Sequence, residues 1–392
     1  MFKDRRMFDQ KLQQIKAAGL YREMRYLQSP QGAHVRIGGE DILMLSSNSY
    51  LGLCADLRLK QAARDAIEKF GTGSGGSRLT TGSCEIHKEL EAEIAAFKGT
   101  EAALVFNTGY MANVGVLSAI ADKSWVIFSD RLNHASIIDG CRLSGAEVIV
   151  YEHADPADLE RKAASCRGRR GLIVTDGLFS VDGDIAPLPA LVEIARKYRL
   201  LLMVDDAHAT GVLGAKGGGT ADYFHLTDGI DIAMGTFSKA LASEGGFIAG
   251  SRALIDYLAN TARSFIFSTA LSPATIAVSL AAINIVQTEP GRRKTLLANA
   301  AWFREKLRAN GFDVSDHPTP VISVMLGRPD LAVEFSERLM GKRIFVSAIR
   351  PPTVPQGTSR LRINLMATHT KEDLSRVLVC LESIGRELRV IR

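Results

Sequence analysis

The stretch LLMVDDAH (201–208) joins an uninterrupted apolar run to two carboxylates and a histidine. An apolar run of this kind is typical of a parallel strand that is covered by helices on both faces. Asp205 stands directly after the run, where the strand must end and a loop must begin. Ligands of open α/β sheets bind at the carboxyl ends of the strands, so this stretch predicts both the fold class and the place of the chemistry.

Similar apolar runs recur along the chain between helical patterns. We expect further strands at residues 104–106, 126–128, 148–150, 172–174 and 232–234. Three of these runs are followed by a polar residue at the strand end, namely Asp130, Asp176 and Thr236. The alternation predicts an α/β fold in which a mostly parallel central sheet is flanked by helices.

The sequence changes in character after residue 290. A basic helical pattern is followed by short strand patterns, a Pro-rich turn and a closing helix from Lys371. The predicted helix and strands lie at residues 292–310, 321–325, 344–348 and 361–365. This order predicts a smaller α+β domain. The expected parts are an N-terminal segment that packs with the small domain (1–45), a large domain (46–290) and the small C-terminal domain (291–392).

Composition excludes several classes of protein. A chain of 392 residues is long enough to bury a large core, and it holds 48 Lys+Arg against 43 Asp+Glu. The net charge is only +5 and the basic residues are scattered, which argues against a nucleic-acid surface. Five cysteines without a CxxC pair favour a reducing cytoplasm. No histidine pair has the HxxxH or HxH spacing, so no metal site is expected.

A membrane span is considered because no charged residue lies between Arg263 and Glu289. The length would suffice for a span. Polar residues interrupt this stretch, and Ser272-Pro273 has the pattern of an N-cap followed by proline in the first turn. The charged N-terminus is not followed by an apolar signal segment. We therefore expect a buried helix and no membrane association.

The glycine-rich stretch GTGSGGSRLTTG (71–82) contains a literal GxGxxG. A dinucleotide fingerprint must follow a strand and begin a helix, whereas residues 61–70 have a helical pattern. The context therefore argues against a dehydrogenase. A flexible loop and a close approach of the backbone to a ligand or partner both remain open.

Asp205 and Lys239 each follow a predicted strand. Either residue alone is more often a helix cap or an exposed loop side chain. Together they supply the two groups that a pyridoxal 5'-phosphate (PLP) enzyme needs, a lysine that forms a Schiff base and a carboxylate for the pyridine nitrogen. His134 follows another strand, and a ring-stacking role for it depends on accepting this pair.

Ten blocks of the sequence resemble the α-oxoamine synthases. These PLP enzymes of fold type I, which are aspartate aminotransferase-like, condense an amino acid with an acyl thioester and release carbon dioxide. The blocks are SSNSYLGL (46–53), GTGSGGSRLTTG (71–82), HKELE (87–91), NTGYMAN (107–113), LNHASIIDG (132–140), DGLFSVDGDIAPL (176–188), VDDAHATGVLG (204–214), GTFSKA (235–240), FIFSTALSP (265–273) and SAIRPPTVPQGTSRLRI (347–363). The departures from the family pattern, Ser49 and Ala209, concern local backbone shape.

The resemblance implies a role for each matching residue. The catalytic residues would be Lys239 for the Schiff base, His134 on the ring, Asp205 at the pyridinium nitrogen and His208 at the ring oxygen. The cofactor-binding residues would be Gly109, Tyr110, His134, Ser180, Asp205, Asp206, Ala207, His208, Thr236, Phe237, Ser238, Lys239, Ser268 and Thr269. The substrate-binding residues would be Arg22, Asn48, His134, Thr353 and Arg362, with Arg25 as the alternative to Arg22.

The substrates implied by the resemblance come from two blocks. GSGGSRL and AIRPPTVPQGTSRLR are typical of family members that join L-alanine to a pimeloyl thioester in biotin biosynthesis. The acyl carrier, coenzyme A or an acyl carrier protein, remains open. A homodimer is expected, with Ser268 and Thr269 reaching the partner's site. The alternatives are a glycine C-acetyltransferase or another α-oxoamine synthase, and a non-catalytic PLP-binding regulatory module.

Overall fold

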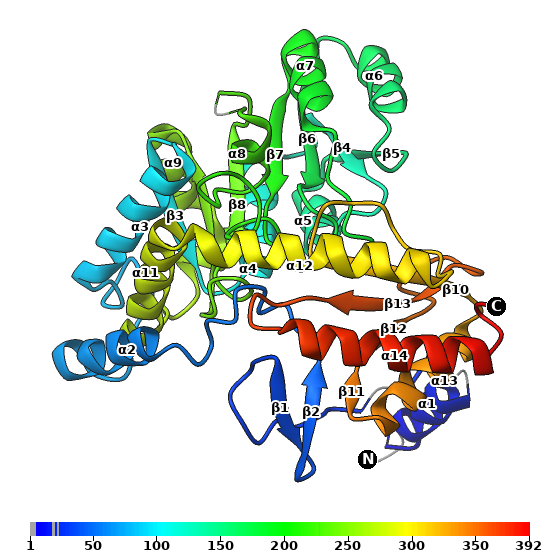
Figure 1. Cartoon of the computed structure of the whole chain (residues 1–392). Coiled ribbons are helices and arrows are strands. Elements are labelled where there is room, and N and C mark those ends of the chain that lie inside the picture. Colours follow the sequence, from blue (N-terminus) through cyan, green and yellow to red (C-terminus); the bar gives the residue numbers. More distant parts are fainter. Residues whose placement is uncertain (1–4, 18–19, 22, 227) are drawn as a thin grey trace.

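A seven-stranded sheet forms the centre of the larger part of the chain in the computed structural model (Figure 1). The structure describes residues 5–17, 20–21, 23–226 and 228–392. In spatial order the strands are β3 (Ala102–Phe106), β9 (Gly246–Gly250), β8 (Ile232–Thr236), β7 (Leu201–Asp205), β6 (Arg170–Asp176), β4 (Trp125–Asp130) and β5 (Glu147–Tyr151). β9 is antiparallel to both neighbours, and the pairs from β8 to β5 are parallel. The six predicted strands and the mostly parallel sheet are confirmed.

β9 is the strand that the sequence did not predict. Its sequence, GFIAG, begins and ends in glycine and lacks the long apolar run of its neighbours. A Cβ atom at Gly246 would lie 2.7 Å from the Cα of Gly109, so only glycine lets this strand pass the start of α4 (Gly109–Ile120), the helix that follows β3.

Helices cover both faces of the sheet, as successive residues of β6 show. Leu172 and Val174 pack in one buried cluster with residues of α4, α5 and α9, whereas Ile173 packs in another with α6 and α7. The helices are α2 (Leu57–Phe70), α3 (Glu85–Lys98), α4 (Gly109–Ile120), α5 (Ala135–Ser144), α6 (Pro156–Ser165), α7 (Leu188–Tyr198), α8 (Thr220–Phe224), α9 (Arg252–Thr261), α10 (Arg263–Ile266) and α11 (Pro273–Thr288). The sheet core is therefore closed on both sides, and its strand ends are the places left for a ligand.

The remaining elements form two small sheets. β10 (Val321–Gly327), β13 (Ser359–Asn364) and β12 (Ser347–Ile349) are antiparallel, and β1 (His34–Ile37), β2 (Glu40–Met44) and β11 (Ile344–Phe345) form the other sheet. The helices of this part are α1 (Arg5–Ala17), α12 (Pro290–Ala309), α13 (Pro329–Gly341) and α14 (Lys371–Glu387). The predicted strand 344–348 is thus two short strands in different sheets. Leu43 pairs with Ile344, so the N-terminal segment contacts the C-terminal part, while the domain boundaries stay a prediction.

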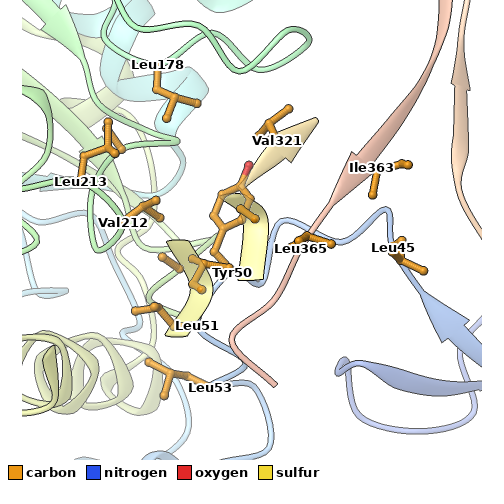
Figure 2. Close-up of a cluster of buried hydrophobic side chains, with 14 of the residues drawn as sticks. Leu45, Tyr50, Leu51, Leu53, Leu178, Val212, Leu213, Val321, Ile363 and Leu365 are labelled. Atoms are coloured by element: carbon orange, nitrogen blue, oxygen red, sulfur yellow. The ribbon is translucent and has the colours of Figure 1, made fainter. Parts of the chain in front are cut away.

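The segment that follows β2 crosses between the large and the small part. Figure 2 shows Tyr50 among buried side chains from this segment, from loops of the large part and from the small antiparallel sheet. The cluster includes Leu45, Leu51, Leu53, Leu178, Val212, Leu213, Val321, Ile363 and Leu365. Each fully buried leucine contributes about 2 kcal/mol, so this cluster holds the two parts together.

The uncharged stretch forms α11, as its capping pattern predicts. The Ser272 side chain accepts a hydrogen bond from the amide of Thr275, and Pro273 is the first helical residue. Among the residues that the structure describes, none of the helices combines the length and the apolar character needed to span a membrane.

Candidate active site

A cavity of about 200 Å³ lies at the carboxyl ends of the central strands. Its walls come from the starts of α4 and α5, from the loops after β4, β6, β7 and β8, and from the ends of the three strands β6, β7 and β8. The lining residues are Thr108, Gly109, Tyr110, Asn113, His134, Ser136, Asp176, Ser180, Asp205, Ala207, His208, Met234, Thr236, Ser238 and Lys239. The fold therefore collects one amine, two carboxylates and two imidazoles at the edge where α/β sheets bind ligands.

Lys239 enters the cavity from the loop after β8 and is half-buried. Burial lowers the pKa of its amine below the ordinary value, although the carboxylates of Asp205 and Asp176 oppose the shift. Within the described part of the chain, its ammonium makes no hydrogen bond or ion pair. A lysine in this state is available as a nucleophile and as a base.

Asp205 is held by two donors at the end of β7. Asn113 Nδ2 donates to Asp205 Oδ2 over 2.7 Å, and the amide of Ala207 donates to Asp205 Oδ1 over 2.8 Å. Only 3% of Asp205 is exposed. Both donors favour the ionised carboxylate, so a charged acceptor stands in a fixed position at the cavity wall.

His134 begins α5 and is exposed at the cavity. Its amide donates to Asp176 Oδ2 over 2.8 Å, and its Nδ1 lies 2.8 Å from the hydroxyl of Ser136. Desolvation of the ring lowers its pKa, although the charge of Asp205 opposes this shift. Burial and the Asp205 charge raise the pKa of Asp176 well above the ordinary value. The imidazole is therefore a neutral ring held by Ser136, while the backbone of His134 is held by the end of β6.

His208 lines the cavity and is buried against Tyr50. The Tyr50 hydroxyl lies 2.7 Å from His208 Nδ1, and Tyr50 is fully buried. Burial lowers the pKa of His208 well below its ordinary value, and the positive charges of Lys239 and Arg362 add to this. Burial also raises the pKa of Tyr50 to about 12. Both groups are thus neutral at physiological pH.

Arg362 and Asn48 come together from β13 and from the segment after β2. Arg362 Nη2 donates to Asn48 Oδ1 over 3.0 Å, and Asn364 Nδ2 donates to the same oxygen over 2.9 Å. Arg362 Nε and Asn364 Oδ1 are buried and have no partner among the described residues. A small anion with two oxygens would supply the hydrogen-bond acceptors that the Arg362 guanidinium lacks.

Asp206 turns away from the cavity to a buried lysine. Lys98 Nζ lies 3.2 Å from Asp206 Oδ2 and donates to the Gly218 carbonyl over 2.6 Å, and both side chains of the pair are 3% exposed. The Thr220 hydroxyl donates to Asp206 Oδ1 over 2.6 Å. These contacts fix Asp206, which stands between Asp205 and the turn that carries His208.

Lys98→Ala should lower the free energy of unfolding by about 3–5 kcal/mol, because the carboxylate of Asp206 would remain buried without its cation. Guanidinium denaturation followed by circular dichroism measures this loss. Lys88→Ala, at an exposed position of the same helix, is the matched control. A loss below about 1 kcal/mol in Lys98→Ala would contradict the stabilising role. The double variant Lys98→Met, Asp206→Asn should recover much of the loss, since it leaves no buried charge.

His153 bridges the loops that carry His134 and Ser180. Its Nδ1 lies 2.9 Å from Asp130 Oδ1 and its Nε2 lies 2.9 Å from Asp184 Oδ2. The ring also contacts Phe179 edge-on, with centroids 4.5 Å apart. Burial alone would lower the pKa of His153, but the two carboxylates outweigh it and raise the pKa to about 10.

The stabilisation by His153 should therefore depend on pH. Because the folded-state pKa exceeds the unfolded value, the contribution is complete below about pH 6.5 and is lost as the pH rises through about 10. The ring is 27% exposed, so we expect about 2 kcal/mol after solvent screening. Denaturation of wild type and His153→Gln between pH 6 and 11 measures it. The two curves should converge at high pH, and a constant difference would contradict the bridge.

The structure places most of the predicted residues at the cavity. Gly109, Tyr110, His134, Ser180, Asp205, Ala207, His208, Thr236, Ser238 and Lys239 line it. The side chains of Asp206 and Phe237 do not, because Asp206 pairs with Lys98 and Phe237 packs on Phe247 in the core. Asn48 and Arg362 are not among the lining residues but hydrogen-bond each other, and their role in holding the amino-acid carboxylate stays a prediction.

The other predicted residues lie elsewhere. Thr269 bridges to Ser77 of the glycine-rich stretch, Ser268 lies against Met111 of α4, and their reach into a partner stays a prediction. Thr353 is exposed outside the cavity lining. Arg22 lies outside the described residues, and the Arg25 guanidinium lies over the Phe345 ring at 4.5 Å.

The glycine-rich stretch folds tightly against the same chain. A Cβ atom at Gly76 would lie 2.2 Å from Thr81 Oγ1, and one at Gly82 would lie 2.1 Å from the Gly76 carbonyl oxygen. The amide of Ala270 donates to the Gly76 carbonyl over 2.9 Å. Close approach of the backbone, rather than flexibility, therefore accounts for these two glycines.

Several polar residues of the site were not predicted from the sequence. Asn113, Ser136 and Thr108 line the cavity, and the Tyr50 hydroxyl contacts His208. Asp176, which also lines the cavity, was predicted to stand at a strand end but without a role. Asn113 and Ser136 sit on helices among apolar neighbours, and a residue of this kind is recognised only when its partners are known.

Fold and cavity together define an enzyme of the class that includes the aminotransferases. The sequence matches the family described as aminotransferase class I and II over residues 40–381. It is 54% identical over 386 residues to the 8-amino-7-oxononanoate synthase of Lysinibacillus sphaericus, covering 98% of this chain and 99% of that protein. The chain belongs to the 8-amino-7-oxononanoate synthase family.

Solved structures agree with this assignment. A serine palmitoyltransferase from S. paucimobilis, solved with a bound PLP–myriocin aldimine, matches with a TM-score of 0.93 and 31% identity over 99% of each chain. An 8-amino-7-oxononanoate synthase from Francisella tularensis matches with a TM-score of 0.77 and 28% identity over 88% of this chain and 98% of that one. The predicted fold type I and the resemblance to the α-oxoamine synthases are confirmed.

Proposed function

We propose that this protein joins L-alanine to a pimeloyl thioester with loss of carbon dioxide, giving 8-amino-7-oxononanoate and the free thiol carrier, a step of biotin biosynthesis. The observation that carries the proposal is the gathering of Lys239, Asp205, His134 and His208 at one cavity. The name and the full-length similarity of the Lysinibacillus sphaericus relative support the choice of substrates.

The chemistry of the cavity fits PLP. The Asp205 carboxylate could pair with the pyridine nitrogen, and the His208 imidazole could hydrogen-bond the ring oxygen. The Lys239 amine could form a Schiff base with the aldehyde. The phosphate would bind at the start of α4, where the first amides of a helix lack partners within the helix, with the Ser238 hydroxyl nearby. When bound, PLP supplies an electron sink that stabilises negative charge at the α-carbon of an amino acid.

The residues of the chain divide the remaining work. With its lowered pKa, Lys239 supplies a neutral amine that takes the α-proton of alanine and later returns a proton. Asp205 holds a proton at the pyridine nitrogen through its fixed carboxylate. His134 offers a neutral imidazole whose N–H stabilises the oxyanion that develops on the thioester carbonyl.

The carboxylate of alanine would bind at Arg362. Its buried Nε lacks a partner, and Nη2 is turned toward Asn48, so the guanidinium and the Asn48 amide form one polar wall. A bidentate pair between guanidinium and carboxylate fixes the orientation of the amino acid. The α-carbon of alanine would then be oriented toward the Lys239 amine by this pair, without a contribution from the acyl group.

The acyl group and the assembly complete the proposal. Arg22 or Arg25 would hold the distal carboxylate of the pimeloyl chain, with Thr353 beside it, and coenzyme A or an acyl carrier protein would be the thiol carrier. A homodimer would bring Ser268 and Thr269 to the partner's phosphate site. The odd number of cysteines, all of them free, supports a place in the reducing cytoplasm.

Product analysis by mass spectrometry tests the proposed function. The purified protein with PLP is given L-alanine or glycine together with a pimeloyl or an acetyl thioester, on coenzyme A and on an acyl carrier protein. We expect 8-amino-7-oxononanoate from L-alanine and the pimeloyl group. A preference for glycine and acetyl would instead identify a glycine C-acetyltransferase, and PLP binding without any product would identify a regulatory module.

A further inference from the structure

His134 is connected to Asp205 by two buried polar side chains. Asn113 Nδ2 donates to Ser136 Oγ over 2.8 Å as well as to Asp205 Oδ2 over 2.7 Å. Ser136 Oγ lies 2.8 Å from His134 Nδ1, and the amide of Ser136 donates to the same nitrogen over 3.3 Å. Asn113 and Ser136 are each 1% exposed, so water does not compete for these contacts.

The direction of each hydrogen bond follows from which groups have a hydrogen to give. An ionised carboxylate only accepts, so the amide nitrogen of Asn113, and not its oxygen, faces Asp205. The same nitrogen also donates to Ser136 Oγ, so the serine oxygen acts as the acceptor in this hydrogen bond. Among the described residues, the remaining contact of the Ser136 hydroxyl is His134 Nδ1. The hydroxyl hydrogen therefore has one acceptor, the imidazole.

A second donor sets the same direction independently. The backbone amide of Ser136 cannot accept a hydrogen bond, so its contact requires a lone pair on His134 Nδ1. If Nδ1 carried a proton, the amide and the ring would present two hydrogens to each other, and the buried Ser136 hydroxyl would lose its acceptor. The partial desolvation that lowers the pKa of His134 agrees with an uncharged ring.

We propose that Asn113 and Ser136 are positioning residues that hold His134 as the neutral tautomer protonated at Nε2, so that an N–H donor faces the cavity. This inference deepens the proposed function, on which it rests. The reacting thioester carbonyl would then meet a hydrogen-bond donor that needs no proton uptake and no rotation of the ring. Asn113 also donates to Asp205. A single side-chain amide therefore fixes the positions of both the His134 donor and the carboxylate that would pair with the pyridine nitrogen.

The tautomer is measured directly by ¹⁵N NMR of the full-length PLP-bound protein labelled at the histidine ring nitrogens. The His134 signals are assigned by their loss in His134→Gln. We expect a protonated Nε2 and an unprotonated Nδ1 at pH 7.5. A protonated Nδ1, alone or in an imidazolium, would overturn the proposal whatever the enzyme catalyses, whereas an intact Nε2–H in a protein that makes no product would contradict only the proposed function.

Variants of the two positioning residues complete the test. Ser136→Ala removes the hydroxyl donor, so His134 Nδ1 keeps only the longer hydrogen bond from the amide of residue 136. A fraction of His134 protonated at Nδ1 should then appear, and kcat should fall about fivefold to tenfold. Asn113→Ala should also shift the tautomer, because the Ser136 hydroxyl is then free to turn. Ser136→Thr keeps the hydroxyl and should restore the wild-type spectrum.

Ser144→Ala is the matched control, because this serine lies on the same helix and donates to the Cys141 carbonyl away from the cavity. It should leave the His134 signals and kcat unchanged. If Ser136→Ala and Asn113→Ala both keep the wild-type tautomer and kcat, Asn113 and Ser136 have no positioning role. A circular dichroism spectrum of each variant shows whether it is folded, and the wild-type spectrum decides the tautomer even where a variant is not.

Discussion

Lys239→Ala should lose about four orders of magnitude in kcat, because it removes the amine proposed to move the α-proton of alanine. The visible absorbance band of bound PLP should change at the same time, since the proposed partner of the cofactor aldehyde is gone. Turnover with L-alanine and a pimeloyl thioester, together with an absorbance spectrum of the purified protein, measures both effects.

Lys239→Arg separates the amine from its charge. A guanidinium keeps the positive charge near Asp205 and Asp176 but does not lose a proton in proteins, so this variant should be as inactive as Lys239→Ala. Lys60→Ala, at an exposed position of α2, is the matched control and should retain wild-type turnover. If Lys239→Ala kept a tenth of the wild-type kcat, Lys239 would not be the base.

The central sheet was predictable because its strands are buried on both faces. Residues 201–204 and 172–174 are apolar without alternation, a pattern that is typical of a strand covered on both sides. β9 was missed for the opposite reason, since its glycines serve a close backbone approach at Gly109 and leave little apolar signal. The small strands β11 and β12 could not be separated, because a run of five residues does not show which sheet each half joins.

The site was predictable where a reactive side chain follows a strand. Asp205 and Lys239 obey this rule, and the cavity contains both. The rule fails for Asp206, because consecutive residues at a strand end point in different directions. Only the structure shows that Asp206 faces Lys98 and not the cavity. Tyr50 lies 158 positions from His208, and its hydroxyl contact depends on how the two parts of the molecule pack.

A larger groove of about 420 Å³ between α2, α3 and α11 shows why volume alone does not locate chemistry. Its apolar walls are four alanines with Phe70, Ile86 and Leu280, and Lys69, Asn284 and the carboxylates Asp65, Glu89 and Glu93 also line it. It lies between helices and not at the carboxyl ends of the strands. The smaller cavity gathers Lys239, His134 and Asp176, whose pKa values are all shifted by burial or desolvation.

Asp205→Asn should lower kcat about 10²-fold to 10³-fold, because an uncharged amide does not hold a proton at the pyridine nitrogen. The change has a second cost. Asp205 accepts from Asn113 at one oxygen and from the Ala207 amide at the other, whereas asparagine has a single oxygen and would turn a donor toward one of them.

The two effects of Asp205→Asn are separable. The misplaced donor should lower the free energy of unfolding by about 1–3 kcal/mol, which denaturation of the purified variant measures. The catalytic loss should remain at temperatures where the variant is fully folded, and PLP should still bind through Lys239. Asp65→Asn, on the exposed side of α2, is the control for a lost carboxylate. Turnover within about threefold of wild type in folded Asp205→Asn would mean that the pyridine nitrogen needs no carboxylate, and the role of Asp205 would then be only to hold Asn113 and, through it, the ring of His134.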